Sequence, residues 1–160
     1  MKTLFIEDRN EINEVIRACK TCFVAMSDGD TPYVLPMNFA LEDDVIILHS
    51  AQSGRMWETL SKNAKVCINW TLGEELAWQD ARVGCSYRVK SKSVIVEGEA
   101  EITDDYNEKH RLLHKVMAQY SGLEFRFNQP AIVNVGIIKV HIKKITGKIF
   151  GTKPAIPGKH

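Results

Sequence analysis

The chain has 160 residues, of which 44% are hydrophobic and 26% are charged, and its formal net charge is +1 at pH 7. These totals are typical of one globular domain with its own core. They argue against a nucleic-acid-binding surface, which normally shows clustered basic residues, and against a membrane span, which needs an apolar run of roughly 18 residues. Glu7 and Asp8 interrupt the N-terminal apolar stretch, so it does not resemble a signal peptide. We therefore expect a cytoplasmic protein with reduced cysteines and with no nucleic-acid or membrane partner.

Three helices are predicted from capping residues and helical spacing. The first begins near Asp8, which together with Glu11 resembles a capping box, and continues to Cys19. The second is short and runs from Ser53, as its N-cap, to about Ser61. The third follows Asp104 and ends at Ser121-Gly122. Its buried stripe would consist of Leu112, Leu113, Val116, Met117 and Tyr120.

Six segments have the composition and alternation of strands: 21–27, 33–41, 45–49, 64–71, 86–102 and 131–146. Asp28-Gly29-Asp30 is a hairpin turn signal, Gly98 indicates a bulge or a close approach, and 73–83 has no clear period and is predicted as a loop. The links between strands are too short for parallel crossovers, and closure into a barrel would hide the sheet edges. The prediction is a mainly β fold, a six-stranded antiparallel barrel with flanking helices, in one domain over residues 1–150 with a tail at 151–160.

Two motifs invite a metal or redox interpretation. Cys19-x-x-Cys22 ends a helix and enters a strand, which is the reverse of a thioredoxin-like motif, and Cys67 and Cys85 do not supply the second pair of a zinc site. Two buried thiols without a task are therefore favoured.

The second motif is the pair His110 and His114, which share one helix face at a spacing that can hold a metal. The pair lacks an acidic residue at the expected place and has no third ligand in view. A solvent-facing pair is favoured, so no metal site is predicted.

The run 32–56, PYVLPMNFALEDDVIILHSAQSGRM, is the strongest candidate site. Its second strand leads through His49, Ser50 and Gln52 to a helix start at Ser53, Gly54 and Arg55. Free backbone N–H groups, the helix dipole and an arginine fork favour a bound phosphate at such a place. Taken singly, Ser53 could be only a cap, Arg55 only a surface residue and His49 only a core residue. Together they predict a phosphorylated ligand beside a β-sheet.

Three further segments stand out together: FVAMSDGDTPYVLPMNFALEDDVIILHSAQSGRMWETLSKNAKVCINW, SKSVIVEGEAEI and IIKVHIKKITGK. Their order and spacing resemble the pyridoxamine 5′-phosphate oxidase-like split-barrel family of flavin-nucleotide-binding proteins, and within it the nitroimidazole-resistance type. The resemblance covers about Cys19 to Lys148. It implies a six-stranded split β-barrel and a homodimer with two flavin mononucleotide (FMN) sites at the subunit interface. The C-terminal KIFGTKPAIPGKH does not match the pyridoxamine oxidases proper, so that particular activity is not expected.

The resemblance also implies roles for individual residues. Pro36, Met37, Asn38 and Phe39 would line the flavin ring through backbone and side-chain contacts. His49, Ser50 and Ala51 would follow the ribityl chain, and Arg55 with Met56 would hold the phosphate. Asn69 and Ser93 would be polar neighbours from adjoining strands. Many relatives have lysine at the Arg55 position, which keeps the sign of the charge and changes its geometry.

The activity implied is FMN-dependent oxidoreduction between a small-molecule electron donor and an acceptor, with a nitroreductase-like reaction as the expected kind. The flavin would carry the chemistry, and the protein would orient it and exclude water. His49 is the candidate catalytic proton donor, because an unperturbed histidine titrates near neutrality. The alternative is a flavin or haem carrier on the same barrel without turnover.

Overall fold

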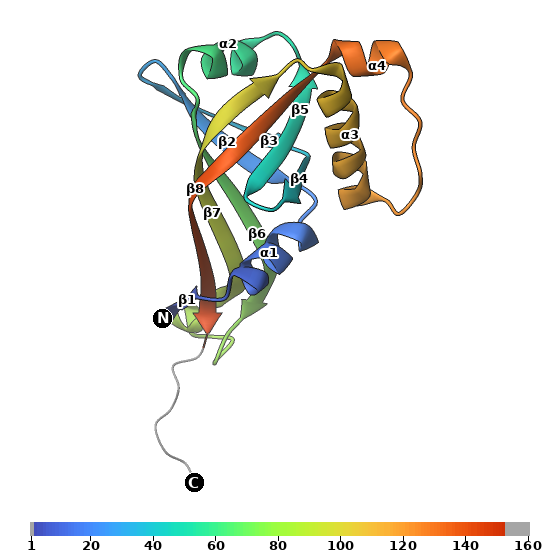
Figure 1. The fold of residues 1–160 in the computed structure, drawn as a ribbon. Helices are drawn as coiled ribbons and strands as arrows, with labels where there is room; N and C mark the ends of the chain where they lie inside the picture. The colour runs from blue at the N-terminus through green and yellow to red at the C-terminus, as the bar shows by residue number, and fades with distance from the viewer. Residues whose placement is uncertain (1, 153–160) are drawn as a thin grey trace.

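The computed structural model describes residues 2–152, which form one antiparallel sheet with helices packed around it (Figure 1). The sheet has eight strands in the order β3-β2-β6-β7-β8-β5-β4, and β1 pairs with β8. The strands are β1 Lys2–Ile6, β2 Cys22–Asp28, β3 Thr31–Met37, β4 Phe39–Glu42, β5 Val45–Ala51, β6 Lys65–Ala77, β7 Arg88–Thr103 and β8 Val135–Thr152. The helices are α1 Arg9–Ala18, α2 Arg55–Lys62, α3 Tyr106–Tyr120, α4 Gln129–Asn134 and the short 3₁₀ turn η1 Gly84–Ser86.

The predicted fold class, a mainly β antiparallel barrel with flanking helices, is confirmed, but the strand count of six is wrong. One additional strand is β1, which pairs with the far end of β8. The other arises because the segment predicted as 33–41 is broken at Asn38 into β3 and β4. The break separates two pieces that pair with different partners, β3 with β2 and β4 with β5.

The barrel closes at that break. β3 and β4 are the two ends of the strand order, and only Asn38 separates them in the chain, so the two edges of the sheet meet there. Alternate residues of the strands fill the interior, as the two-residue period requires. Fully buried interior residues include Ile16, Val24, Phe39, Ile46, Ile68, Trp70, Val94 and Val96.

A second apolar cluster lies outside the barrel, between β5 and the helices α3 and α4. It contains Ile47, Ile137, Leu112, Leu113, Val116 and Ile132. Glu42 in β4 accepts hydrogen bonds from Arg111 at 2.8 Å and pairs with Lys115 at 2.9 Å, which ties α3 to the sheet. This contact lowers the pKa of the Glu42 carboxyl below its usual value, because both cations favour the ionised form.

The helix starts are largely as predicted, with two shifts. The Asp8 side chain caps α1 by accepting from Asn10 N at 2.9 Å. Asp105, not Asp104, caps α3, and Gly54, not Ser53, occupies the N-cap of α2. Gly54 has φ 93°, a conformation that favours glycine, and this turn sets the start of α2 one residue later than expected.

Two segments differ from their predicted secondary structure. The predicted loop 73–83 contains the end of β6, because Glu75, Leu76 and Ala77 pair with β7 after an irregularity at Gly73. Exposure on both sides of this strand removes the alternation that would have identified it. The predicted strand 131–146 begins with α4, whose cap Asn128 accepts from Ala131 N at 2.9 Å. Asn128 followed by Pro130 is a helix-start signal that the strand prediction overlooked.

Two further expectations concern Gly98 and the C-terminus. The ladder between β7 and β8 shifts register between Glu97 and Gly98, which confirms the predicted bulge. A Cβ atom at Gly98 would lie 2.6 Å from the His141 carbonyl oxygen, so the close approach is also confirmed. β8 extends to Thr152, and the rest of the predicted tail lies outside the described residues.

The closure at Asn38 is held by one hydroxyl group. The Tyr120 hydroxyl accepts from Phe39 N at 2.9 Å and donates to Lys20 O at 3.0 Å. The same Lys20 carbonyl also accepts from Asn38 Nδ2 at 3.3 Å. The end of α3 is thereby joined to the start of β4 and to the segment between α1 and β2.

We predict that Tyr120→Phe lowers the free energy of unfolding by about 1–3 kcal/mol, because the part-buried backbone N–H of Phe39 loses its acceptor. Chemical denaturation monitored by tryptophan fluorescence measures it. Tyr87→Phe is the matched control, since Tyr87 donates only to Ala81 O within an exposed connection. Equal effects of the two substitutions would contradict a special role for Tyr120.

Candidate functional site

The turn from β5 into α2 forms a polar elbow. The side chain of Ser50 donates to Ala51 O at 2.8 Å, and residues 51–55 are all exposed. The N-cap Gly54 offers no side chain, so the first N–H groups of α2 have no side-chain cap. Uncapped N–H groups together with the helix dipole favour an anion at this position.

The elbow is fixed against the end of α4 and the start of β8 by two contacts. Gln52 Nε2 donates to Val133 O at 2.6 Å and to Val135 O at 2.9 Å. The Trp57 ring lies over Gly136, where a Cβ atom would come within 2.4 Å of it. Neither contact was predicted from the sequence. Both hold the elbow and the start of α2 against the junction of α4 and β8.

Arg55 lies at the mouth of the elbow. Its Nε donates to Asp28 Oδ2 at 2.9 Å, and its guanidinium carbon lies 4.3 Å from the centre of the Tyr33 ring. Within residues 2–152, its two terminal nitrogens have no hydrogen-bonding partner. The fork of the guanidinium is therefore held in place while its two outer nitrogens can bind an anion.

His49, the candidate catalytic residue, lies in β5 just before the elbow. It pairs with Ile137 of β8, and its Nδ1 is buried without a hydrogen-bonding partner in the described part of the chain. Burial lowers the pKa of His49 from its ordinary value near 6.5, because desolvation disfavours the charged ring. At neutral pH the ring is therefore uncharged.

Three of the predicted site residues belong to the core. Met37, Phe39 and Met56 are buried in the barrel interior, and the Phe39 ring meets Trp70 edge-on at 5.4 Å. Side-chain contacts from Met37 and Phe39 to a bound ligand are therefore excluded in this conformation, and only their backbone could take part. Asn38 between them is exposed.

The remaining predicted residues lie on the outer face of the sheet. Pro36 in β3 is opposite Phe23 in β2, and Phe23 is opposite Asn69 in β6. Ser93 in β7 pairs with Thr71, which donates to Asn69 Oδ1 at 3.4 Å. The strand register thus brings Pro36, Asn69 and Ser93 to one surface. Phe23, which the sequence analysis did not single out, stands between them.

Apart from the exposed Asn38 and the buried Met37, Phe39 and Met56, the predicted residues form two sets. The elbow set is His49, Ser50, Ala51 and Arg55, and the outer-face set is Pro36, Asn69 and Ser93 with Phe23. Within residues 2–152, no hydrogen bond or ion pair joins a member of one set to a member of the other.

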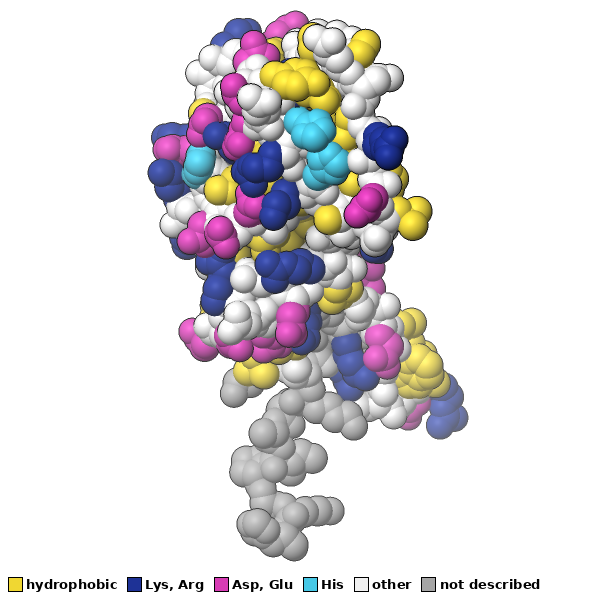
Figure 2. All heavy atoms as spheres, turned by 45° about the vertical axis from the view of Figure 1, so that its right-hand side comes forward, with side chains coloured by type: hydrophobic (Ala, Val, Ile, Leu, Met, Phe, Trp, Pro, Cys, Tyr) yellow, Lys and Arg dark blue, Asp and Glu magenta, His cyan; other side chains and the backbone are white. Residues whose placement is uncertain are grey.

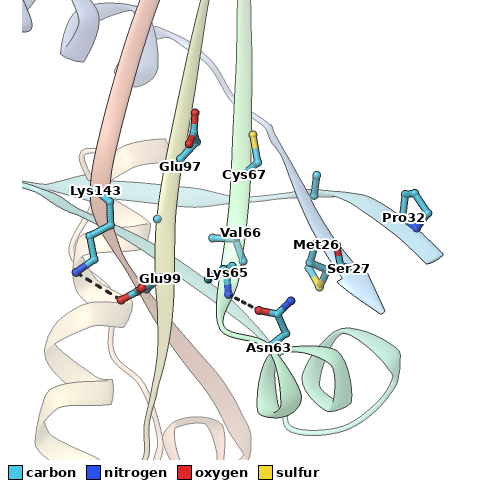
Figure 3. A pocket seen from close by; sticks show the side chains of 12 residues that line it. Met26, Ser27, Pro32, Asn63, Lys65, Val66, Cys67, Glu97, Glu99 and Lys143 are labelled. Carbon is cyan, nitrogen blue, oxygen red and sulfur yellow. Dashed lines mark hydrogen bonds and ion pairs between the residues drawn. The ribbon is translucent and has the colours of Figure 1, made fainter. Parts of the chain in front are cut away.

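A hollow of about 560 Å³ adjoins the outer-face set (Figure 3). It lies over β2, β6, β7 and β8, with Cys67 and Lys65 on one side and Glu97, Glu99 and Lys143 on the other. Lys143 is 3.4 Å from Glu99, so the charges at this rim offset one another. Pro32 belongs to both the hollow and the face of β3 that carries Pro36, which places the hollow beside the outer-face set.

The two thiols of the Cys19-x-x-Cys22 motif are not arranged as a redox or metal site. Both thiols are free and buried, and their sulfur atoms donate to Thr71 O and Met37 O at 3.4 and 3.5 Å. Burial raises the pKa of the Cys22 thiol to about 12, so it is not a nucleophile near neutral pH. Among the described residues, no group of three or more His, Cys, Asp or Glu side chains is placed to hold a metal ion.

The structure combines a small antiparallel barrel with an uncapped helix start and an arginine beside it. Comparison with known families identifies the class of protein that has this combination. The chain belongs to the pyridoxamine 5′-phosphate oxidase family, whose model matches residues 8–149. The resemblance stated from the sequence is thereby confirmed. No curated protein matches the chain.

Solved structures with the same fold include a candidate 5-nitroimidazole antibiotic resistance protein from Bacteroides thetaiotaomicron. It is 38% identical, with a TM-score of 0.84, over 92% of this chain and 87% of that one. The flavocytochrome Anf3 from Azotobacter vinelandii is 20% identical, with a TM-score of 0.81, over 98% and 73%. An FAD-binding protein from Mesorhizobium loti is 19% identical, with a TM-score of 0.67, over 94% and 100%. The last two show the fold alone.

None of the helices within residues 2–152 is both long and apolar enough to cross a bilayer.

The buried imidazole of His49 predicts a pH effect on stability. Above about pH 6.5 both the folded and the unfolded chain hold a neutral ring. Below that pH the unfolded chain takes up a proton before the folded chain does, so the free energy of unfolding decreases as pH falls toward the lowered pKa of the folded state. His49→Gln should show a shallower loss between pH 6.5 and 5 in urea titrations. His141→Gln, an exposed residue beside Glu101, is the control; a profile unchanged in His49→Gln would refute the assignment.

Proposed function

We propose that the chain is an FMN-dependent oxidoreductase that works as a dimer, with the flavin bound between the elbow set of one subunit and the outer-face set of the other. The observation that carries the proposal is the uncapped start of α2 beside Arg55, in a member of a phosphate-binding enzyme family. Electron donor and acceptor would be small molecules.

The elbow fits the phosphate end of FMN. The two terminal guanidinium nitrogens of Arg55 and the uncapped first N–H groups of α2 supply donors at one end of the helix, and Ser53 precedes them in the chain. Asp28 offsets part of the charge of Arg55, which leaves a site suited to a dianionic phosphate rather than a strongly attractive surface for any anion. The family's frequent lysine would act as a point charge, whereas Arg55 can bind two phosphate oxygens at once.

The outer face fits a flat apolar ring. Phe23 and Val34 are 48% and 59% exposed, which is unusual for such side chains, and Pro36 lies beside Phe23. Asn69 Nδ2 donates to Val94 O at 3.2 Å, so its carbonyl oxygen is turned toward Thr71 and remains available as an acceptor. Apolar surface with one or two oriented polar groups is the usual lining of a cofactor site.

When bound, FMN would supply the hydride or electron-pair transfer. The residues of this chain would bind the phosphate, orient the ring and exclude water. A neutral His49 would serve as a hydrogen-bonding group rather than as a cationic acid, because burial disfavours its protonated form. The similarity to a candidate 5-nitroimidazole resistance protein supports a nitro-aromatic acceptor.

We predict that the purified chain releases FMN on denaturation, identified by mass spectrometry, and that the holoprotein oxidises reduced nicotinamide with a nitro-aromatic acceptor. Arg55→Ala should weaken FMN binding by about 10–100-fold, which corresponds to roughly 1.4–2.8 kcal/mol at the phosphate. Flavin fluorescence titration of the apoprotein measures it.

The control for this experiment is Arg82→Ala, whose side chain is 93% exposed in the connection between β6 and β7. Unchanged affinity in Arg55→Ala would refute the phosphate assignment. Tight FMN binding without turnover would favour the alternative function, that of a flavin carrier. Release of haem instead of FMN would contradict the assignment of FMN as the cofactor.

The dimer has its own support in the exposed outer face. A single chain leaves Phe23 and Val34 uncovered next to a hollow, and it leaves the two sets of site residues unconnected. A second copy that covers this face would bury the apolar side chains and bring its elbow to the first chain's outer-face set.

We predict that Phe23→Glu converts the dimer to a monomer in size-exclusion chromatography with light scattering, because a charge cannot be buried unpaired in the interface. The monomer should lose FMN affinity by at least about tenfold, since it holds only half of the site. Leu123→Glu is the matched control, because Leu123 is 74% exposed in the connection between α3 and α4 and belongs to neither set of site residues. A Phe23→Glu variant that stays dimeric would exclude this face as the interface.

A further inference from the structure

Helix α3 presents two histidines to the surface, away from the elbow and the outer face. Figure 2 shows two histidine side chains side by side on this side of the molecule. His110 Nε2 and His114 Nε2 are 3.4 Å apart, whereas the ring centres are 4.7 Å apart. The two nitrogens therefore lie on the facing edges of the rings and converge on one point.

The separation of the nitrogens differs from that of a good hydrogen bond. A nitrogen donor and its acceptor are normally about 2.7–3.2 Å apart, so a distance of 3.4 Å between His110 and His114 leaves at best a weak bond. A strong hydrogen bond therefore does not account for the orientation of the two rings.

The separation matches a tetrahedral metal chelate. Zinc binds histidine nitrogen at about 2.0–2.1 Å, and two ligands at the tetrahedral angle of about 109° are then roughly 3.3–3.4 Å apart. A square-planar ion, with its angle of about 90°, would bring the nitrogens to about 2.9 Å. The observed 3.4 Å is the tetrahedral value.

The pair is also held in place before any ion binds. The Phe127 ring stands edge-on against His114 at 5.1 Å and against His110 at 6.3 Å, which restricts the rotation of both rings. His114 further lines a hollow of about 380 Å³ with Leu123 and Glu124. Restricting free side chains lowers the entropic cost of binding.

The charges around the pair do not oppose a cation strongly. Arg111 and Lys115 lie on the same helix, but both are paired with Glu42, and Arg111 is also paired with Glu108. Glu124 adds a carboxylate at the edge of the hollow beside His114.

We propose that His110 and His114 form a two-histidine site for a divalent transition-metal ion, with zinc as the ion that the geometry fits. The chain supplies two ligands, and water or a side chain from another molecule completes the tetrahedral shell. The site is independent of the flavin, because it lies on α3 and shares no residue with the elbow set or the outer-face set. The geometry thus revises the interpretation of the pair as merely solvent-facing.

Zinc titration of the full-length, untagged protein tests the proposal, with a competing chromogenic chelator as the readout. We expect one zinc ion per chain, and we expect His110→Gln and His114→Gln each to weaken binding by at least about tenfold. Both variants keep a polar side chain at a helix surface, and their thermal melts verify that they remain folded.

Two control variants identify other sources of binding. His141→Gln changes a histidine on β8 that is paired with Glu101 on β7, and Cys85→Ser removes an exposed thiol. Both should bind zinc as the unchanged chain does. Zinc affinity that is unaltered by the α3 substitutions, or that is lost in either control, would overturn the site.

Cobalt substitution gives a second readout that does not depend on affinity alone. A tetrahedral Co²⁺ ion absorbs visible light much more strongly than an octahedral one. We expect the intense spectrum from the unchanged chain and its loss in His110→Gln. A weak octahedral spectrum from the unchanged chain would contradict the tetrahedral chelate.

Discussion

The geometry of this protein depends on how a sheet is closed without a continuous strand. At Asn38 the chain leaves one end of the sheet and begins the other, and the amide of Phe39 loses the partner that a regular ladder would provide. The Tyr120 hydroxyl accepts a hydrogen bond from this amide and donates one to Lys20 O. Because an unpaired half-buried amide is costly, this hydroxyl makes the corner compatible with a folded state. This corner fixes where β3, which carries part of the outer face, lies relative to β4 and its partner β5, which leads into the elbow.

The local features of this architecture could be predicted from the sequence. Alternation identified the central strands, Asp8 identified the start of α1, and Gly98 marked the bulge. The break at Asn38 could not be read in the same way, because Met37 and Phe39 are both apolar and both buried. What distinguishes β3 from β4 is the strand that each pairs with, and pairing is a property of the whole chain. β1 was missed for a related reason, since its partner is about 145 residues away in the sequence.

The candidate site was predictable as a set of residue types and less so as an arrangement. Small polar residues before a helix indicated an anion site, and the elbow has that form. The contacts that set its shape come from distant segments: Asp28 holds Arg55, and the carbonyls of Val133 and Val135 hold Gln52. Likewise, family resemblance placed Met37 and Phe39 at the ring, whereas their side chains fill the barrel. Spacing along the chain reports which residues are near one another, and burial decides which atoms a ligand could reach.

The position of β8 has a consequence for how the chain acquires its structure. This strand follows all the others in the sequence, yet it lies between β7 and β5 in the sheet and also pairs with β1. Until it is in place, β7 and β5 each have an unpaired edge, and the two halves of the sheet are not connected to each other. Folding is therefore dominated by contacts between distant residues, which slows it and exposes strand edges to other chains. During synthesis the barrel cannot assemble before this strand has left the ribosome, so the unfinished protein passes through an interval in which chaperones would be of most use.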